Sequence, residues 1–367
     1  MAIEALSVIH VDTGKEWRGG QQQAAYLHQR LIAMNIASLM ICPPGVPMSA
    51  FCEREKLPYA EVRMHSELDF RAALRIARLA KNRGAGILQL HTSHALTLGL
   101  LVKYLYRSVK LIAVRRVDFH VGRNYLSRQK YRHRFLDKIV CISQRIRDIL
   151  IECGLPKSRL TVIRSGVDTH KFDDVSVPAN FREQNGIPPD SIVIGTVAAL
   201  VGHKDYPTLL RAAAIVLKNR RDVVFCAVGD GGKSLEIEAM GRELGLGERF
   251  IFTGRREDVG MFLKSYDIFV LSSKKEGLGT SVLDAQAVGL PVVACAAGGI
   301  PEMIRDGWNG LLVPKEAPAD LARALLKLVL QPELRRRLGA QARDSVRDFD
   351  IAKTVEGNVA LYLEISV

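Results

Sequence analysis

Short apolar runs alternate with amphipathic runs along most of this chain, and this alternation constrains the fold more than any other feature. Each apolar run is followed by loop residues and then by a stretch in which apolar side chains recur about every 3.6 positions. The apolar runs of the first half are "ALSVIHV", "ASLMIC", "GILQLH", "KLIAVRR", "KIVCIS" and "LTVIRS". Strands that alternate with helices predict a parallel sheet that carries helices on both faces.

A segment with three prolines, "DDVSVPANFREQNGIPPDS", interrupts the alternation at residues 173–191 and predicts a linker with one short helix. The alternation then restarts in "SIVIGTVAAL", "DVVFCAVGD", "RFIFTGR", "IFVLSS", "PVVACAA" and "GLLVP". We therefore expect two doubly wound α/β domains, at residues 1–172 and 173–348. A chain of 367 residues is long enough for two such cores.

The positive charge is concentrated in the first half of the chain. The net charge is +13, with roughly 28 basic and 15 acidic residues up to position 180 and roughly 24 of each after it. A basic half favours an anionic partner, such as a phospholipid surface, a phosphorylated glycan or nucleic acid. A solvated surface without a partner is the alternative. Nucleic acid is disfavoured, because aromatic content is 6% and no recognised nucleic-acid-binding motif is present.

The cysteines and the N-terminal residues indicate the cellular compartment, and the histidines indicate whether a metal site is expected. The six cysteines form no C-x-x-C pair, and "MAIEALSVIHVD" has no basic region or cleavage site. No apolar run reaches the ~18 residues that span a bilayer. These features predict a cytoplasmic protein with reduced thiols. His91 and His94 have no third ligand nearby in sequence, so no metal site is expected.

The candidate site residues lie in loops that follow predicted strands, because ligands of doubly wound sheets bind beyond the carboxyl ends of the strands. In "HVDTGKEWRGGQQQ", Gly19 and Gly20 precede a helix expected to begin near Gln21. Paired glycines allow close backbone approach, and a helix start offers free N–H groups to a diphosphate. A tight turn without a ligand is the alternative, and the G-x-G-x-x-G spacing is absent.

Two further loops in the second half contain residues suited to phosphate. "AVGDGGKS" resembles the end of a Walker A loop, but Ala227 stands where that motif needs glycine, so we retain only a glycine turn at Gly229. Lys204 lies between a predicted strand and helix, where its ammonium can face a phosphate. A solvated loop lysine is the alternative.

Two acids in "KKEGLGTSVLDAQA" flank the start of another predicted helix. Glu276 lies in a glycine loop, the helix is expected to begin near Thr280, and Asp284 follows about one turn later. Carboxylates accept paired hydroxyls of a sugar or ribose, and Ser281 can donate to a phosphate. Ordinary acids near a helix start are the alternative interpretation.

Taken in order, these stretches resemble the retaining nucleotide-sugar glycosyltransferases of family 4, also called glycosyl transferases group 1. The resemblance covers nearly the whole chain. It is strongest in "SSKKEGLGTSVLDAQAVGLPVVACAAGGIPEMIRDGWNGLLVP" at residues 272–314, and is supported by "WRGGQQQ", "GVDTHKF", "VGDGG" and "FTGRREDV". It implies a GT-B fold, in which two Rossmann-like domains face each other across a cleft. The N-terminal domain would bind the acceptor, and the C-terminal domain the donor nucleotide. Residues 349–367 would pack back on the N-terminal domain.

The resemblance also implies roles for individual residues. Glu276, Lys204 and His120 would be catalytic. The donor would contact Gly19, Gly20, Arg164, Lys204, Gly229, Arg256, Glu276, Gly277, Thr280, Ser281, Val282 and Asp284. The acceptor would contact His91, Arg115 and Arg116. No metal or resident cofactor is implied, and the co-substrate would be a UDP- or GDP-sugar.

Three positions depart from the family pattern. Asp284 is one methylene shorter than the usual glutamate, and Ala199 replaces an arginine that often precedes the lysine, which leaves Arg164 or His203 to compensate. Arg115 and Arg116 occupy the place where many members have a histidine. Whether Arg116 or His120 fills that role is left open.

The expected activity is retaining transfer of a hexose-type sugar to a glycan or lipid-linked acceptor, in assembly of bacterial lipopolysaccharide core or another surface polysaccharide. The expected location is the cytoplasm, in association with the inner face of the cytoplasmic membrane through the basic half. A sugar-nucleotide 2-epimerase of the same fold and a non-catalytic nucleotide-sugar-binding protein are the alternatives.

Overall fold

The structure, a computed structural model, describes residues 5–119 and 125–366. It divides the chain into two compact units, residues 1–166 with 351–367, and residues 167–350. We call them the N-terminal unit and the C-terminal unit. The chain leaves the first unit after Gly166, rather than after Phe172, and returns to it after Asp350, rather than after Asp348.

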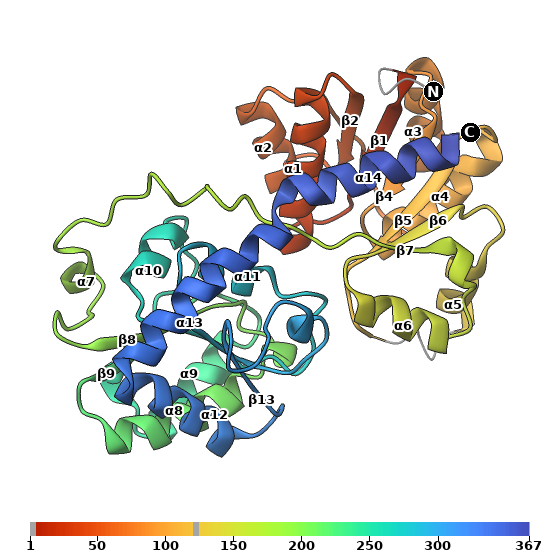
Figure 1. The fold of residues 1–367 in the computed structure, drawn as a ribbon. Coiled ribbons are helices and arrows are strands. Elements are labelled where there is room, and N and C mark those ends of the chain that lie inside the picture. Colours follow the sequence, from red (N-terminus) through yellow and green to blue (C-terminus); the bar gives the residue numbers. More distant parts are fainter. Residues whose placement is uncertain (1–4, 120–124, 367) are drawn as a thin grey trace. The chain divides into compact units, whose positions relative to one another are not determined.

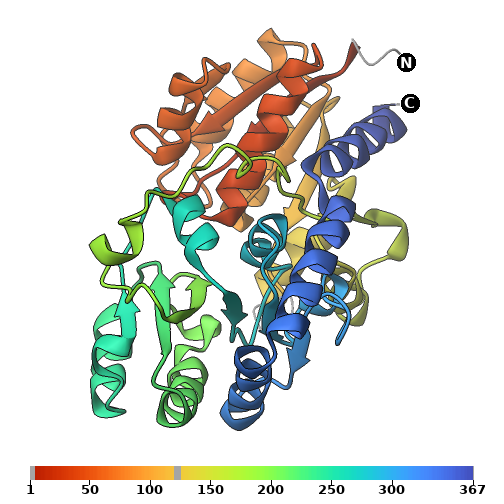
Figure 2. The same cartoon turned by 60° about the vertical axis from the view of Figure 1, so that its left-hand side comes forward.

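The described part of the N-terminal unit holds a seven-stranded parallel sheet in the order β3-β2-β1-β4-β5-β6-β7, with helices on both faces (Figures 1 and 2). Its strands are β1 (Ser7–Val11), β2 (Ala37–Cys42), β3 (Tyr59–Glu61), β4 (Ile87–Leu90), β5 (Lys110–Arg115), β6 (Lys138–Cys141) and β7 (Leu160–Val162). Its helices are α1 (Gly19–Ala33), α2 (Pro47–Arg54), α3 (Phe70–Asn82), α4 (Ser93–Leu105), α5 (Tyr125–Arg132), α6 (Gln144–Glu152), the 3-10 turn η2 (Lys157–Arg159) and α14 (Ile351–Ser366).

The C-terminal unit holds a six-stranded parallel sheet, counted over its residues 167–350, in the order β10-β9-β8-β11-β12-β13. Its strands are β8 (Ile192–Val197), β9 (Val223–Val228), β10 (Phe250–Phe252), β11 (Ile268–Leu271), β12 (Val292–Cys295) and β13 (Leu311–Val313). Its helices are α7 (Phe181–Gln184), α8 (Tyr206–Asn219), α9 (Ser234–Glu243), α10 (Val259–Ser265), α11 (Thr280–Ala287), α12 (Pro318–Leu330) and α13 (Pro332–Ser345), with the 3-10 turns η3 (Gly202–Lys204), η4 (Gly247–Arg249), η5 (Ile300–Glu302) and η6 (Val346–Phe349).

Most residues of the central strands are buried, which explains why their sequences are continuously apolar. Every residue of β9, β11 and β12 is buried. Strands of a parallel sheet lose contact with water on both faces once helices cover them, so no alternation with polar residues is expected. The structure thus confirms the predicted doubly wound parallel sheets. The three-residue strand β3, at the edge of the first sheet, was not anticipated from its sequence "YAE".

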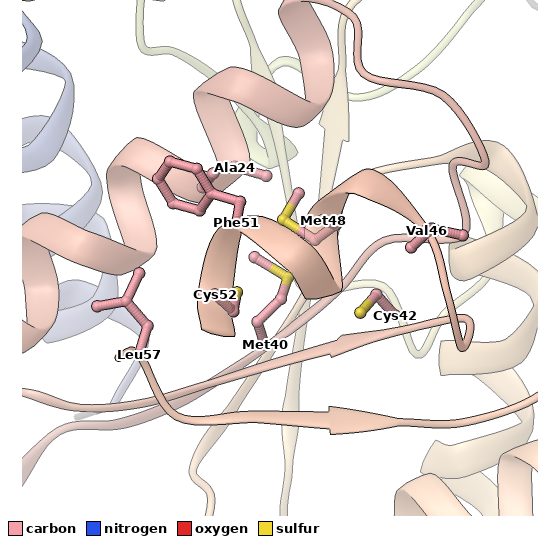
Figure 3. Close-up of a cluster of buried hydrophobic side chains, with 9 residues drawn as sticks. Ala24, Met40, Cys42, Val46, Met48, Phe51, Cys52 and Leu57 are labelled. Atoms are coloured by element: carbon pink, nitrogen blue, oxygen red, sulfur yellow. The ribbon is translucent and has the colours of Figure 1, made fainter. Parts of the chain in front are cut away.

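A hydrophobic cluster fixes the start of α1 in the N-terminal unit. Side chains from α1, β2 and α2 meet in this cluster (Figure 3), and Trp17 packs on it with its ring centroid 5.2 Å from that of Phe51. Its buried members are Ala24, Ala25, Met40, Cys42, Val46, Met48, Phe51, Cys52 and Leu57. The predicted start near Gln21 is wrong: Arg18 is the extended N-cap residue, and α1 begins at Gly19. The glycine pair therefore forms the first turn of the helix instead of a loop before it.

The last helix, α14, belongs to the N-terminal unit, where it packs against α1 (Figure 1). A buried polar network holds it to β4. Gln89 donates to Asn358 Oδ1 (3.0 Å) and accepts a short hydrogen bond from the Tyr362 hydroxyl. Across residues 5–119 and 125–366, the helices are too short or too polar to cross a membrane.

Candidate functional site

A 3-10 turn after β8, η3, carries Lys204 at the carboxyl edge of the second sheet. Hydrogen bonds tie this turn to the loop after β11, the neighbouring strand. Ser272 Oγ donates to the Lys204 carbonyl (2.9 Å), and the Lys274 amide donates to the His203 carbonyl (3.0 Å). The left-handed backbone of Asp205 (φ 51°) then turns the chain into α8. Two loops far apart in sequence are thereby held side by side.

This arrangement brings Lys204 and Glu276 together as an ion pair. Lys204 Nζ contacts Glu276 Oε1, and the Ser273 hydroxyl donates to the same oxygen (3.1 Å). The backbone of Glu276 is fixed as well, because its carbonyl accepts from the Gly299 amide (3.3 Å). Glu276 is only 9% exposed. A nearly buried charge pair with added hydrogen bonds holds both groups in one geometry.

The helix that follows, α11, begins at Thr280 as predicted and opens towards the same loop. Gly279 is its N-cap residue and has a left-handed backbone (φ 98°), which glycine adopts without strain. The first turn contains no acid and no side-chain cap. The amides of Thr280 and Ser281 have no acceptor within the helix, whereas the Val282 amide donates to the Gly279 carbonyl (2.9 Å). Thr280 and Ser281 therefore offer the available amides, and Val282 does not in this conformation.

Asp284, one turn into α11, pairs with a residue that the sequence reasoning did not single out. Lys171 Nζ lies 2.6 Å from Asp284 Oδ1, and both side chains are mostly buried. The contact is an ion pair without hydrogen-bond alignment, since Asp284 Oδ1 accepts no aligned hydrogen bond. The ammonium of Lys171 also lies 4.6 Å from the centre of the Phe172 ring. The only sequence signal was its place in "GVDTHKF", a stretch noted for family resemblance and not for chemistry.

Gly229 closes the site on the β9 side, and no larger residue fits there. Its φ is 147°, and a Cβ atom would come within 2.1 Å of the Ala198 carbonyl oxygen. The loops after β8 and β9 are joined because the Leu200 amide donates to the Asp230 carbonyl (3.1 Å). Arg256, in the loop after β10, forms an ion pair with Asp258. Arg256 Nε (2.9 Å) and Nη2 (2.8 Å) donate to the two oxygens of the Asp258 carboxylate.

In the N-terminal unit, Arg116 links the start of α1 to a chain of histidines. A Cβ atom on Gly20 would lie 3.1 Å from Arg116 Cδ, so the arginine stem runs directly over the helix start. Arg116 Nη2 donates to His91 Nδ1 (3.2 Å), and His91 Nε2 lies 3.0 Å from His10 Nδ1. Arginine only donates, so His91 must carry its proton on Nε2 and donate to His10. Arg116 thus sets the tautomers of both rings.

Burial keeps these histidines neutral. It lowers the pKa of His10 and His91 well below 6.5, and the nearby Arg116 cation lowers both further. Burial also lowers the pKa of His28 to about 4, partly offset by its contact with the Pro58 carbonyl. The pKa of Arg116 falls to about 10 because of burial, while the carboxylate of Asp12 acts in the opposite direction. Asp12 accepts from the Gly14 amide (2.6 Å), and burial raises its pKa.

The other proposed N-terminal residues do not join this group. Arg115 turns away from Arg116: it donates to the Phe119 carbonyl (2.6 Å) and the Tyr131 hydroxyl (3.3 Å). Arg164 is exposed after β7, and its carbonyl accepts from Thr354 of α14 (2.8 Å). His120 lies outside the described residues. No group of three metal-ligating side chains is found in residues 5–119 and 125–366.

Each unit therefore gathers part of the predicted set at the carboxyl edge of its own sheet. The C-terminal unit offers ammonium groups, carboxylates and helix-start amides, which suit a phosphate and paired hydroxyls. The N-terminal unit offers one arginine beside an uncapped helix start. His10, Lys171 and Asp12 are additions that sequence reasoning missed.

Two family models match the chain in succession. "Glycosyltransferase Family 4" matches residues 17–171, and "Glycosyl transferases group 1" matches residues 178–345. The relatives include the putative glycosyltransferase EpsD of Bacillus subtilis, at 30% identity over 65% of this chain and 63% of its own length. A D-inositol 3-phosphate glycosyltransferase of Corynebacterium jeikeium is 34% identical over 62% of this chain and 57% of its own length. The lipopolysaccharide core biosynthesis glycosyltransferase LpsE of Rhizobium meliloti is 29% identical over 67% and 70%. The match to the first two relatives thus spans less than two thirds of their length.

Solved structures match over nearly the full chain. HepE of Anabaena, solved in complex with UDP and glucose, has a TM-score of 0.86 at 20% identity and covers 98% of this chain and 99% of its own. A glycosyltransferase from Rickettsia africae has a TM-score of 0.87 at 20% identity, with 98% of each chain covered. The two family models together cover most of the chain and show that it belongs to the group 1, family 4 glycosyltransferases. The similarity to the solved structures shows that its two Rossmann-like units have the GT-B fold.

Proposed function

We propose that this protein transfers a hexose-type sugar, with retention at the anomeric carbon, from a UDP- or GDP-sugar to a glycan or lipid-linked acceptor. The observation that carries the proposal is the Lys204–Glu276 ion pair beside the uncapped start of α11. A cation, a carboxylate and free amides at one helix start match the diphosphate and hydroxyl groups of a nucleotide sugar.

The C-terminal unit would bind the donor. Lys204 would turn from Glu276 towards the diphosphate, joined by the amides of Thr280 and Ser281, and would offset the negative charge that develops on the leaving group. Glu276 would then accept hydroxyls of the sugar, and Asp284 those of the ribose. Gly19 and Gly20 would lie against the diphosphate, Gly229 and Gly277 would border the donor, and Arg256 would flank the base.

The transfer step forms the bond between the acceptor oxygen and the anomeric carbon as the bond from that carbon to the diphosphate oxygen breaks. The acceptor proton passes to the leaving phosphate, which keeps both events on one face of the sugar. His91 and Arg116 are proposed to face the acceptor, whereas Arg115 is held away from Arg116 by its hydrogen bonds to Phe119 and Tyr131. We propose metal-independent transfer, with Lys204 as the cation, and activity retained in EDTA would support it.

One relative suggests the class of acceptor. LpsE is named a glycosyltransferase of lipopolysaccharide core biosynthesis. The basic first half of this chain suits a phosphorylated or lipid-linked glycan at an anionic surface. We therefore propose a role in lipopolysaccharide core or other surface polysaccharide assembly, at the inner face of the cytoplasmic membrane.

Two alternative functions differ from the transferase in the product that they would form from the donor. A sugar-nucleotide 2-epimerase would form product without an acceptor. A non-catalytic nucleotide-sugar-binding protein is favoured by Ala199 and Asp284, which depart from the family pattern at two positions of the donor site. Incubation with the donor alone, followed by chromatography of the nucleotide sugars, separates the epimerase from both other functions.

A thermal-shift screen tests the donor site first. Purified protein is heated with UDP, GDP, ADP or CMP and their common sugars, with magnesium or with EDTA. We expect one nucleoside diphosphate to stabilise the protein strongly in EDTA, by mass action on the folded state. A folded sample that responds to none of these ligands would contradict the proposal.

A further inference from the structure

Helix α3 of the N-terminal unit presents a face that is both basic and apolar to solvent. Phe70 is 68% exposed and Leu74 41% exposed, and both are large apolar side chains. Arg71, Arg75 and Arg78 are exposed beside them. We call these five residues the α3 face. Residues three and four apart lie on the same side of a helix, so this set is continuous.

The opposite side of α3 is fully used by the fold. Ala72, Ala73, Ile76, Ala77 and Ala80 are buried, and the helix packs against α4. Core packing therefore does not explain Phe70 and Leu74. Large apolar side chains gathered on an exposed surface commonly mark an interaction site.

The α3 face carries positive charge that the protein itself does not neutralise. Within the described residues, Arg71, Arg75 and Arg78 form no ion pair. The neighbouring acids are engaged elsewhere. Asp69 caps the helix through the Ala72 amide (3.0 Å), and Glu67 pairs with Lys130 (3.3 Å). The expected partner is therefore anionic and has an apolar layer within reach of Phe70 and Leu74.

The position of the helix links this face to the candidate site. In a parallel βαβ unit, the helix begins at the edge where the strands end. Phe70 is the first residue of α3, and His91 follows the end of β4 in the same sheet. The apolar end of the α3 face thus lies towards the sheet edge that carries His91 and Arg116.

We propose that the α3 face rests on an anionic lipid bilayer, with Phe70 and Leu74 inserted among the headgroups and the three arginines on the lipid phosphates. This combination is typical of helices that lie in a membrane interface. Nucleic acid would match the arginines but would leave Phe70 and Leu74 unexplained. The inference rests on the proposed function in one respect: it deepens the acceptor class to a lipid-linked one, presented at the bilayer surface.

Vesicle co-sedimentation of the full chain tests this proposal. Vesicles of phosphatidylglycerol mixed with phosphatidylcholine are compared with pure phosphatidylcholine, at about 50 and 500 mM salt. We expect binding to the anionic vesicles that falls steeply with salt. The variant R71Q/R75Q/R78Q should bind on the order of a hundredfold more weakly, at about fivefold for each arginine. F70S/L74S should bind at least fivefold more weakly in both salts.

The matched control is R211Q/K218Q/K327Q, which removes the same charge from exposed positions of α8 and α12 in the C-terminal unit. It should bind vesicles like the wild type. Equal losses in the two triple variants would overturn the proposal, because net charge alone would then govern binding. Unchanged binding by F70S/L74S would overturn it as well. The thermal shift with nucleoside diphosphate, measured on every variant, reports the donor site separately. A wild-type protein that shows no thermal shift with any nucleoside diphosphate would contradict the proposed function, and that result would not bear on the α3 face.

Discussion

The two units hold their candidate groups in opposite electrostatic states. In the C-terminal unit, Lys204 pairs with Glu276, and Lys171 with Asp284, so opposite charges face each other at a helix start. In the N-terminal unit, His10 and His91 are neutral and hydrogen-bonded in a row that ends at the cation of Arg116.

This difference indicates what each unit can do when a ligand arrives. A paired lysine can exchange its carboxylate for a ligand phosphate and so keep a counter-ion, while the released carboxylate accepts hydrogen bonds from ligand hydroxyls. A neutral histidine row has no charge to release, but it fixes the position of the arginine at its end. We infer that the C-terminal unit is built for exchange and the N-terminal unit for orientation.

The largest expected effect comes from breaking the ion pair between Lys204 and Glu276. E276A should lower turnover by on the order of a hundredfold or more, because the donor sugar would lose the group that is proposed to position it. Nucleoside diphosphate binding should persist, since Lys204 remains available. Turnover with the identified donor and calorimetric titration of the nucleotide measure the two effects. E276Q, which keeps the size and hydrogen bonding of the side chain, should retain more activity than E276A. Near-normal turnover by E276A would show that the role assigned to Glu276 is wrong.

Removing the positive charge of Arg116 in the N-terminal unit should have the next largest effect. We expect R116M to lower kcat by roughly tenfold to a hundredfold while nucleotide affinity changes little, because Arg116 is the cation held over the start of α1. R115M is the matched control: Arg115 contacts Tyr131 and Phe119, so its loss should affect stability more than kcat. Equal reductions of kcat in the two variants would contradict the proposal that Arg116 contributes to catalysis through its place over the start of α1.

Lys171 should affect donor affinity and selectivity, with kcat nearly unchanged. If Lys171 fixes Asp284 for ribose hydroxyls, K171M should raise the donor KM by about tenfold and reduce discrimination against the 2′-deoxy nucleotide, which lacks one hydroxyl. Competition between UDP and 2′-deoxy-UDP measures this, or the GDP pair if guanosine is the base identified. K274M removes an exposed pair with Glu316 and should change neither quantity. An unaltered preference for ribose in K171M would argue against the ribose role.

The sequence predicted the repeated sheets well because continuous apolar runs are a strong signal of buried parallel strands. The helix start at Thr280 was predictable from the glycine loop before it, whereas the start at Gly19 was not. Its N-cap residue, Arg18, carries no capping side chain, and the packing of Trp17 that fixes the turn is tertiary. Local helix signals cannot report such contacts.

The contacts between side chains far apart in sequence were the least predictable part of the site. Lys171 and Asp284 lie far apart in sequence, and no short-range pattern connects them. The same holds for His10, which reads as an ordinary residue of an apolar strand until its contact with His91 is known. The opposite directions of Arg115 and Arg116 also follow from tertiary contacts, with Tyr131 and Phe119 for one and His91 for the other.

The last expected effect concerns stability instead of activity: the two units should differ in pH dependence. The pKa of His28 is lowered to about 4 in the folded protein, against 6.5 when unfolded. Between these values the unfolded chain binds a proton that the folded chain does not, so the N-terminal unit loses stability as pH falls from 6.5 towards 4. One such histidine contributes up to ~1.4 kcal/mol per pH unit. Burial raises the pKa of Asp12, which opposes this loss.

His170 in the C-terminal unit provides a control of opposite sign, because its hydrogen bond with Asp173 raises its pKa. Its contribution is present below pH 6.5 and is lost as pH rises through the raised pKa. Hydrogen exchange of peptides from each unit, followed from pH 7.5 to 4.5 and corrected for intrinsic rates, measures the two slopes separately. We expect H28Q to reduce the acid loss of the N-terminal unit without removing it, because the pKa values of His10 and His91 are lowered as well, and we expect H170Q to leave it unchanged. An equal slope in wild type and H28Q would mean that His28 is protonated in the folded protein, and the electrostatic contrast between the units would then rest on His10 and His91 alone.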